Sequence, residues 1–151
     1  MGELTETLKR HDLVGIHTSI FIYQVEDSPR YATLSEEALD ALSNGVFKGI
    51  TSILTLMEVA VRPLQFGHRD AADEYELLLS SFPNLLVVEL DRACDRRAAE
   101  LRATYRLRPA DSLQVAACLQ HGTTALLTND KGLRRVQELD VVILDDFVSE
   151  A

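Results

Sequence analysis

Residues 13–23 read LVGIHTSIFIY: an apolar run, three polar residues and then a second apolar run. The first run has the length and the continuous apolar character of a strand that is covered on both faces. The second run is typical of a buried helix. Polar groups at such a junction destabilise a fold unless they are hydrogen-bonded or bound to a ligand. We therefore expect His17, Thr18 and Ser19 to have a structural or functional partner where this strand meets its helix.

Further apolar runs of strand length follow along the chain, and helical patterns separate them. The expected strands are LVGI (13–16), VFKGI (46–50), NLLVVEL (84–90), TALL (124–127) and VVIL (141–144). The expected helices cover residues 19–25, 30–44, 52–64, 68–81, 91–107, 109–121 and 130–138. Strands that alternate with helices predict an α/β protein with a mostly parallel sheet of five strands. Ligands of such sheets bind beyond the carboxyl ends of the strands, so polar residues directly after strands are functional candidates.

Length and composition indicate one packed domain. The chain has 151 residues, of which 46% are hydrophobic and 26% charged, and a chain of this size buries roughly two-thirds of its unfolded surface. No apolar run approaches the ~18 residues of a membrane span, and the polar start MGELTETLKRHD is unlike a secretory signal. Cys94 and Cys118 lie in helical patterns without a pairing motif, as expected of buried thiols in a reducing cytosol. We expect a single cytoplasmic domain over residues 1–151, with residues 1–12 as an N-terminal extension and no membrane contact.

The net charge of −9 argues against a protein that simply coats nucleic acid, because such a protein needs a cationic surface. A nuclease stays open, since acids that bind a metal ion also make the charge negative. Four arginines fall on the polar face of the expected helix 91–107: Arg92, Arg96, Arg102 and Arg106. They form either a ridge that contacts phosphate or a solvated face, and the acidic residues between them favour the solvated face.

Three acidic residues are candidates for function. Each lies either where burial of a carboxylate destabilises the fold or near the end of a strand or the start of a helix, where ligands of parallel sheets bind. Glu58 lies in ITSILTLMEVAV, a helix that is apolar nearly all the way round, so its carboxylate needs a ligand or a partner such as Arg62. Asp111, in RPADSLQVAACL, falls in a first helical turn, where the helix dipole favours negative charge. Asp130, in ALLTNDKGL, follows a strand and suits the N-cap of the next helix. Taken singly, the last two are explained as structural residues, whereas the set of three indicates function.

The segments GIHTSIFIY, TSILTLMEVA, LRPADSLQVAACLQHG and ALLTNDKGL, in this order, resemble the four motifs of the PIN domain. Among PIN domains, the VapC-like toxin ribonucleases of bacteria are the most similar. The resemblance extends from about residue 13 to residue 144. It implies a three-layer α/β/α sandwich and cleavage of RNA phosphodiester bonds that depends on Mg²⁺ or Mn²⁺. It also implies a cognate antitoxin protein as partner and a homodimer.

The resemblance also implies roles for individual residues. The acids that match the family's metal site are Glu58, Asp111 and Asp130. The residues that match its supporting polar groups are Thr18, Ser52, Thr128 and Asn129. As possible phosphate contacts we add Lys131 and the four arginines of helix 91–107. Two carboxylates ~5 Å apart repel by roughly 3 kcal/mol at an effective dielectric constant of ~20, so converging acids favour a divalent ion, which also activates water.

His17 departs from the family pattern, because it stands where PIN domains have their first acid. Neutral imidazole in place of a carboxylate removes one negative charge and one oxygen ligand, which weakens Mg²⁺ binding and favours Mn²⁺ or Zn²⁺. His17 is thus either a metal ligand or the sign of an impaired site. Two functions follow: a metal-dependent endoribonuclease, or a PIN module that binds RNA or a protein partner without cleavage. If the acids are only helix caps, metal ions will not raise the melting temperature.

Overall fold

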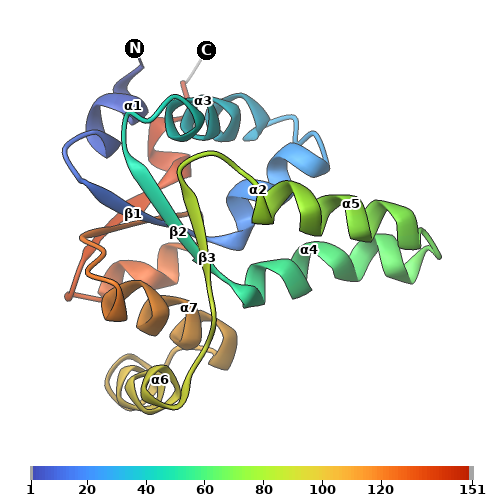
Figure 1. Cartoon of the computed structure of the whole chain (residues 1–151). Helices are drawn as coiled ribbons and strands as arrows, with labels where there is room; N and C mark the ends of the chain where they lie inside the picture. The colour runs from blue at the N-terminus through green and yellow to red at the C-terminus, as the bar shows by residue number, and fades with distance from the viewer. Residues whose placement is uncertain (1, 150–151) are drawn as a thin grey trace.

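The computed structural model describes residues 2–149 and contains a five-stranded sheet with helices on both of its faces (Figure 1). The strand order is β3-β2-β1-β4-β5, and all neighbouring strands are parallel. The strands are β1 (Leu13–Ile16), β2 (Lys48–Ser52), β3 (Leu85–Val88), β4 (Ala125–Thr128) and β5 (Asp140–Ile143). The expected α/β fold with a mostly parallel sheet is confirmed, and the expected strands overlap the observed ones.

The helices form two layers around the sheet, each with its own apolar cluster. On one face lie α1 (Glu3–Leu8), α2 (Thr18–Val25) and α3 (Ala32–Ser43), and on the other lie α6 (Arg92–Tyr105) and α7 (Pro109–Gln120). Between β2 and β3, the chain forms α4 (Ile53–Gln65) and α5 (Arg69–Ser80), a helical hairpin that projects beyond the sheet (Figure 1). Within residues 2–149, no helix combines the length and the apolar character that a membrane crossing requires.

The N-terminal residues, which we expected as an extension over residues 1–12, include a short helix. From Glu3 to Leu8 they form α1, and the side chains of Leu4 and Leu8 are buried in the same cluster as those of α2 and α3. Glu37 of α3 accepts hydrogen bonds from the backbone N–H and the hydroxyl of Thr5, at 2.9 and 2.7 Å. The start of the described chain therefore packs as part of the domain.

The expected helix over residues 130–138 is wrong in both its type and its length. The structure has a short 3₁₀ helix there, η1 (Lys131–Arg135), and a second one, η2 (Leu144–Phe147), directly after β5. Leu133 and Val136 are both buried, and their spacing of three residues suits the three residues per turn of a 3₁₀ helix.

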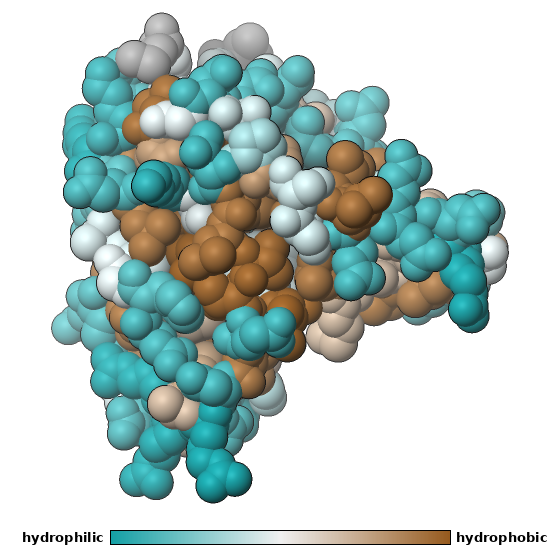
Figure 2. Space-filling model, viewed as in Figure 1, coloured by the Kyte–Doolittle hydropathy of each residue, from teal (hydrophilic) through white to brown (hydrophobic). Residues whose placement is uncertain are grey.

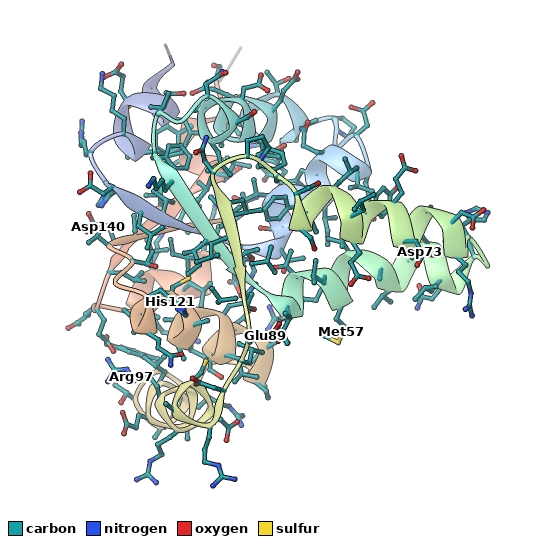
Figure 3. All side chains as sticks on the ribbon, in the orientation of Figure 1. Met57, Asp73, Glu89, Arg97, His121 and Asp140 are labelled. Carbon is teal, nitrogen blue, oxygen red and sulfur yellow. The ribbon has the colours of Figure 1, made fainter. Side chains whose placement is uncertain are left out.

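Helix α4 does not have the fully apolar surroundings that its sequence suggested. Met57 and Leu64 are 55% and 50% exposed, while only Thr55 and Val59 of this helix are buried. Met57 extends from α4 away from the sheet (Figure 3). Because the α4–α5 hairpin projects from the sheet, much of the apolar surface of α4 meets solvent, and Glu58 is half-buried rather than enclosed.

Helix α7 packs directly against the backbone of the central strand β1. A Cβ atom at Gly15 would lie only 2.5 Å from the Sγ atom of Cys118, so only glycine permits this close approach. Cys94 and Cys118 are free and buried, as expected, and burial raises the pKa of the Cys118 thiol to about 12. This contact fixes α7, and with it Asp111, beside the carboxyl end of β1.

Candidate active site at the carboxyl ends of β1 and β4

The strand order reverses at β1, which lies between β2 and β4. In open parallel sheets, the carboxyl ends of the strands at such a switch point form the usual ligand site. The backbone N–H of His17, directly after β1, donates to the carbonyl of Leu127 in β4 at 2.9 Å. Polar residues from the ends of β1 and β4, and from the first turns of α2 and α7, therefore meet at this edge.

His17 bridges the end of β4 and the first turn of α7. Its Nε2 atom lies 3.2 Å from Oδ1 of Asp111, and its Nδ1 atom lies 3.1 Å from the hydroxyl of Thr128 and 3.3 Å from that of Ser19. Asp111 is only 8% exposed. The hydrogen bond from His17 lowers the pKa of Asp111, and Arg108 lowers it further, although burial acts in the opposite direction. The polar residues at this junction thus have the partners that we expected.

Arg108 joins two of the expected acids. Its Nε atom donates to Oδ2 of Asp111 at 3.1 Å, and its Nη2 atom donates to Oδ2 of Asp130 at 3.3 Å. The other oxygen of Asp130 accepts from the backbone N–H of Gly132 at 2.9 Å, so Asp130 caps η1 as predicted. Both acids line one cavity of about 200 Å³. Our sequence reasoning missed Arg108, although its position three residues before Asp111, in the RPAD segment, is a signal for such a pair.

Glu58 lies in a neighbouring cavity of about 320 Å³, between α2, α4 and α5. Its Oε1 atom accepts a hydrogen bond from the hydroxyl of Thr18 at 2.8 Å. Arg62, which we considered as its partner, instead pairs with Glu26 at 2.9 Å, so that alternative is wrong. Through Thr18 and the adjacent His17, Glu58 is linked to Asp111.

A buried polar network beneath the site connects β2, α2, α4 and α7. The hydroxyl of Ser52 donates to the amide oxygen of Gln114 at 2.5 Å, and the amide nitrogen of Gln114 donates to the hydroxyl of Thr55 at 2.7 Å. Thr55 in turn contacts Thr51 and Thr18 at 2.7 and 2.9 Å. The sequence reasoning identified Ser52 and Thr18 but missed Gln114, whose only signal is a polar side chain on the apolar side of its helix.

Asn129 and Lys131 both contact the segment after β5. The side chain of Asn129 donates to the hydroxyl of Tyr23 at 3.0 Å and accepts from the backbone N–H of Asp145 at 2.9 Å. Lys131 forms an ion pair with Asp145 at 3.0 Å. The hydrogen bonds from Lys131 and Tyr31 lower the pKa of Asp145 to about 2. Asn129 therefore connects the end of β4 to α2 and η2 through hydrogen bonds. The ammonium group of Lys131 is already paired with the carboxylate of Asp145.

Of the four arginines on the polar face of α6, the structure brings one to the acidic cavity. Arg106 lines it, together with Arg108 and Arg135. Arg102 donates to the backbone carbonyl of Leu107 at 2.9 Å. The two remaining arginines are exposed near the start of α6, outside the residues that line this cavity: Arg92 and Arg96.

The donor atoms decide whether a divalent ion suits this site. Within the described range 2–149, no group of three or more His, Cys, Asp and Glu residues has the placement of a metal site. Asp111 and Asp130, however, both pair with the positively charged guanidinium group of Arg108, and the side chain of Arg108 is 77% exposed. Hard divalent ions bind through one or two carboxylates and several waters, so the pair fits Mg²⁺ or Mn²⁺. His17 does not offer a free nitrogen, because both of its ring nitrogens have protein partners.

Comparisons with known proteins identify the family and the fold. Residues 16–139 match the PIN domain family, whereas no curated protein sequence matches the chain. The chain is similar to a chain of a toxin–antitoxin complex from Klebsiella pneumoniae, with 19% identity, a TM-score of 0.63 and coverage of 87% of this chain and 97% of that one. It is also similar to a chain of VapBC2 from Rickettsia felis bound to a promoter DNA fragment, with 17% identity, a TM-score of 0.68 and coverage of 87% and 98%. VapBC-1 from nontypeable Haemophilus influenzae gives 16% identity, a TM-score of 0.65 and coverage of 88% and 98%.

Proposed function

The chain belongs to the PIN domain family, and we propose that it is a VapC-like nuclease that hydrolyses RNA phosphodiester bonds with Mg²⁺ or Mn²⁺. One observation carries this proposal. The carboxylates of Asp111 and Asp130 both pair with the guanidinium group of Arg108. They lie at the switch point of the sheet, where ligands of parallel sheets bind. Buried acids with a perturbed pKa in a cavity are typical of functional sites, and Asp111 is such an acid.

In this proposal, Asp111 and Asp130 would hold the ion, and the exposed guanidinium group of Arg108 would turn away from them. When bound, a divalent ion would supply Lewis-acid activation of a phosphate oxygen and of a water molecule. His17 keeps the carboxylate of Asp111 in place through its Nε2 contact. Thr18 orients Glu58, the third acid of the proposed site, and Asn129 fixes the end of β4 next to Asp130.

A second function has its own supporting observation. Both carboxylate oxygens of Asp111 are engaged by protein donors, one by His17 and the other by Arg108. A site that the chain neutralises in this way favours a PIN module that binds RNA or a protein partner without cutting RNA. The distinction depends on whether an ion replaces Arg108.

Cleavage of end-labelled single-stranded RNA separates these two functions. We would compare the wild type with Asp111→Asn and His17→Asp, in Mg²⁺, Mn²⁺ or Zn²⁺, and use Asp95→Asn as the control because Asp95 is an exposed acid of α6. Cleavage that Asp111→Asn abolishes and Asp95→Asn preserves supports the nuclease. An inert wild type that His17→Asp activates supports the module without cleavage. A wild type that stays inert with all three ions refutes the nuclease.

We also propose an antitoxin protein and a second copy of the chain as partners, in the cytoplasm. Hydrophobic residues gather over β3 and the near end of α4 (Figure 2), and Leu86 and Met57 there are 56% and 55% exposed. Exposed apolar patches of this kind mark protein interfaces. Free cysteines are usual in a reducing compartment. Light scattering on the purified chain tests the homodimer, which a monomer mass at all concentrations refutes, and co-purification with the product of a neighbouring gene tests the antitoxin.

A further inference from the structure

Three arginines converge on the cavity that contains Asp111 and Asp130. Arg106 caps the end of α6, Arg108 precedes α7, and Arg135 ends η1, so separate segments of the chain bring them to the same cavity of about 200 Å³. Like charges that share a cavity repel one another unless anions lie between them. The two acids of the cavity contact Arg108.

Arg106 and Arg135 are not neutralised in the same way. Neither side chain takes part in an ion pair or a side-chain hydrogen bond within residues 2–149, whereas the neighbouring Arg134 binds Asp146 at 2.6 Å. The chain has 24 acidic and 15 basic residues, so acidic partners are abundant. Two guanidinium groups in one cavity are thus available to an external anion.

The backbone conformation of Arg106 also supports a functional role for this residue. This residue has φ 57° and ψ 39°, the left-handed conformation, which glycine or asparagine usually supplies at the end of a helix. A side chain is unfavourable in this conformation, and strained positions of this kind cluster at functional sites. The turn that it makes leads directly into Leu107 and Arg108, and so brings Arg106 and Arg108 to one cavity.

From these observations we infer that Arg106 and Arg135, with Arg108, form a phosphate-binding subsite for the RNA backbone beside the acidic pair. The planar guanidinium group binds phosphate oxygens through two parallel hydrogen bonds, so arginine suits this ligand. The subsite extends the proposed function: it rests on RNA as the substrate and holds a phosphate next to the bond to be cut. Arg108 lines the same cavity and would contribute the third guanidinium group.

Binding of a short, end-labelled oligouridylate in EDTA, followed by fluorescence anisotropy, tests the subsite without cleavage. The variants are Arg106→Gln, Arg135→Gln and the double variant, and the control is Arg69→Gln. Arg69 is exposed, starts α5 on the projecting hairpin (Figure 1) and gives the same change in charge. We expect each subsite variant to raise the Kd roughly two- to fivefold. The slope of log K against log salt should fall by about 0.7 for each phosphate that the variant no longer binds, whereas the control should change neither quantity.

The outcomes separate this inference from the proposed function. The subsite would be overturned by any of three results. The wild type and the double variant bind RNA equally well, Arg69→Gln loses as much affinity as the subsite variants, or the wild type does not bind RNA. A wild type that never cleaves RNA, but whose binding depends on Arg106 and Arg135, would refute the nuclease and keep the subsite. Thermal unfolding of each variant checks that the fold is intact, and the exposed positions of both arginines make loss of folding unexpected.

Discussion

Replacing Gln114 with leucine tests whether the buried polar network holds the proposed site together. The side chain of Gln114 is 2% exposed. Its oxygen accepts from Ser52 at 2.5 Å and its nitrogen donates to Thr55 at 2.7 Å, and these bonds connect α7 to β2 and α4. Leucine fills a similar volume and can make neither bond, so the substitution isolates the polar contribution.

The expected loss of stability follows from the partners that the leucine variant leaves behind. A hydrogen bond between neutral groups contributes about 0.5–1.5 kcal/mol net, and a buried group left without its partner costs about 1–3 kcal/mol. The hydroxyl of Ser52 is buried and loses its acceptor, while Thr55 keeps its contacts with Thr51 and Thr18. We therefore expect Gln114→Leu to lower the free energy of unfolding by roughly 2–4 kcal/mol. For a domain of this size, the melting temperature then falls by about 5–15 °C.

Thermal and urea unfolding, followed by far-ultraviolet circular dichroism, measure this loss. Gln120→Leu is the matched control, because Gln120 lies on the same helix and its amide contacts Asp91 in an exposed position. We expect the control to unfold at nearly the wild-type temperature, since water replaces an exposed contact. If Gln114→Leu is as stable as Gln120→Leu, the network does not hold the elements together and the reasoning is refuted.

Three further predictions concern other parts of the fold. Gly15→Ala should lower the free energy of unfolding by about 1–3 kcal/mol in urea titrations, because the new Cβ atom would lie 2.5 Å from Cys118 Sγ; adding Cys118→Ala should recover part of that loss. The Cys118 thiol, with a pKa of about 12, should resist thiol reagents at neutral pH and react only after unfolding in guanidinium chloride; modification of the native protein at the rate of the unfolded one would contradict this. The pKa of Asp145 is lowered to about 2, so its contribution to stability is complete above its unfolded pKa of about 4 and disappears as the pH falls toward 2. Melting temperatures from pH 5 to pH 2 should therefore fall less steeply in Asp145→Asn than in the wild type, and parallel curves would show that this carboxylate contributes nothing.

The strands were predictable from sequence because parallel strands covered on both faces need continuous apolar runs. LVGI and TALL have this character and form the central pair β1 and β4. Residues 1–12 and α4 were harder to interpret because their surroundings depend on tertiary structure. Leu4 and Leu8 are too few to reveal a packed helix, and the apolar side chains of α4 do not reveal that its hairpin leaves the sheet.

The site was predictable at its acids and not at their partners. Asp111 and Asp130 were identified as part of a set with Glu58; the structure brings these two to one cavity and places Glu58 in another. Gln114 bonds to Ser52, which lies 62 residues away in the chain, and local patterns carry no information about such a contact. Arg108 was missed for a different reason: its spacing to Asp111 is a local signal for one ion pair, but its second partner, Asp130, lies 22 residues away in the chain.

His17, which the sequence resemblance aligns with the first acid of PIN domains, and Arg108 together have one electrostatic consequence. A further carboxylate at residue 17 would face Asp111, and two carboxylates ~5 Å apart repel by roughly 3 kcal/mol at an effective dielectric constant of ~20. His17 replaces that repulsion with a hydrogen bond to Asp111, and Arg108 places one positive charge between Asp111 and Asp130. One guanidinium group between two carboxylates thus leaves less net negative charge to attract an ion. In the proposed nuclease, a divalent ion would compete with Arg108 for Asp111 and Asp130, so the ion concentration would decide between cleavage and binding alone.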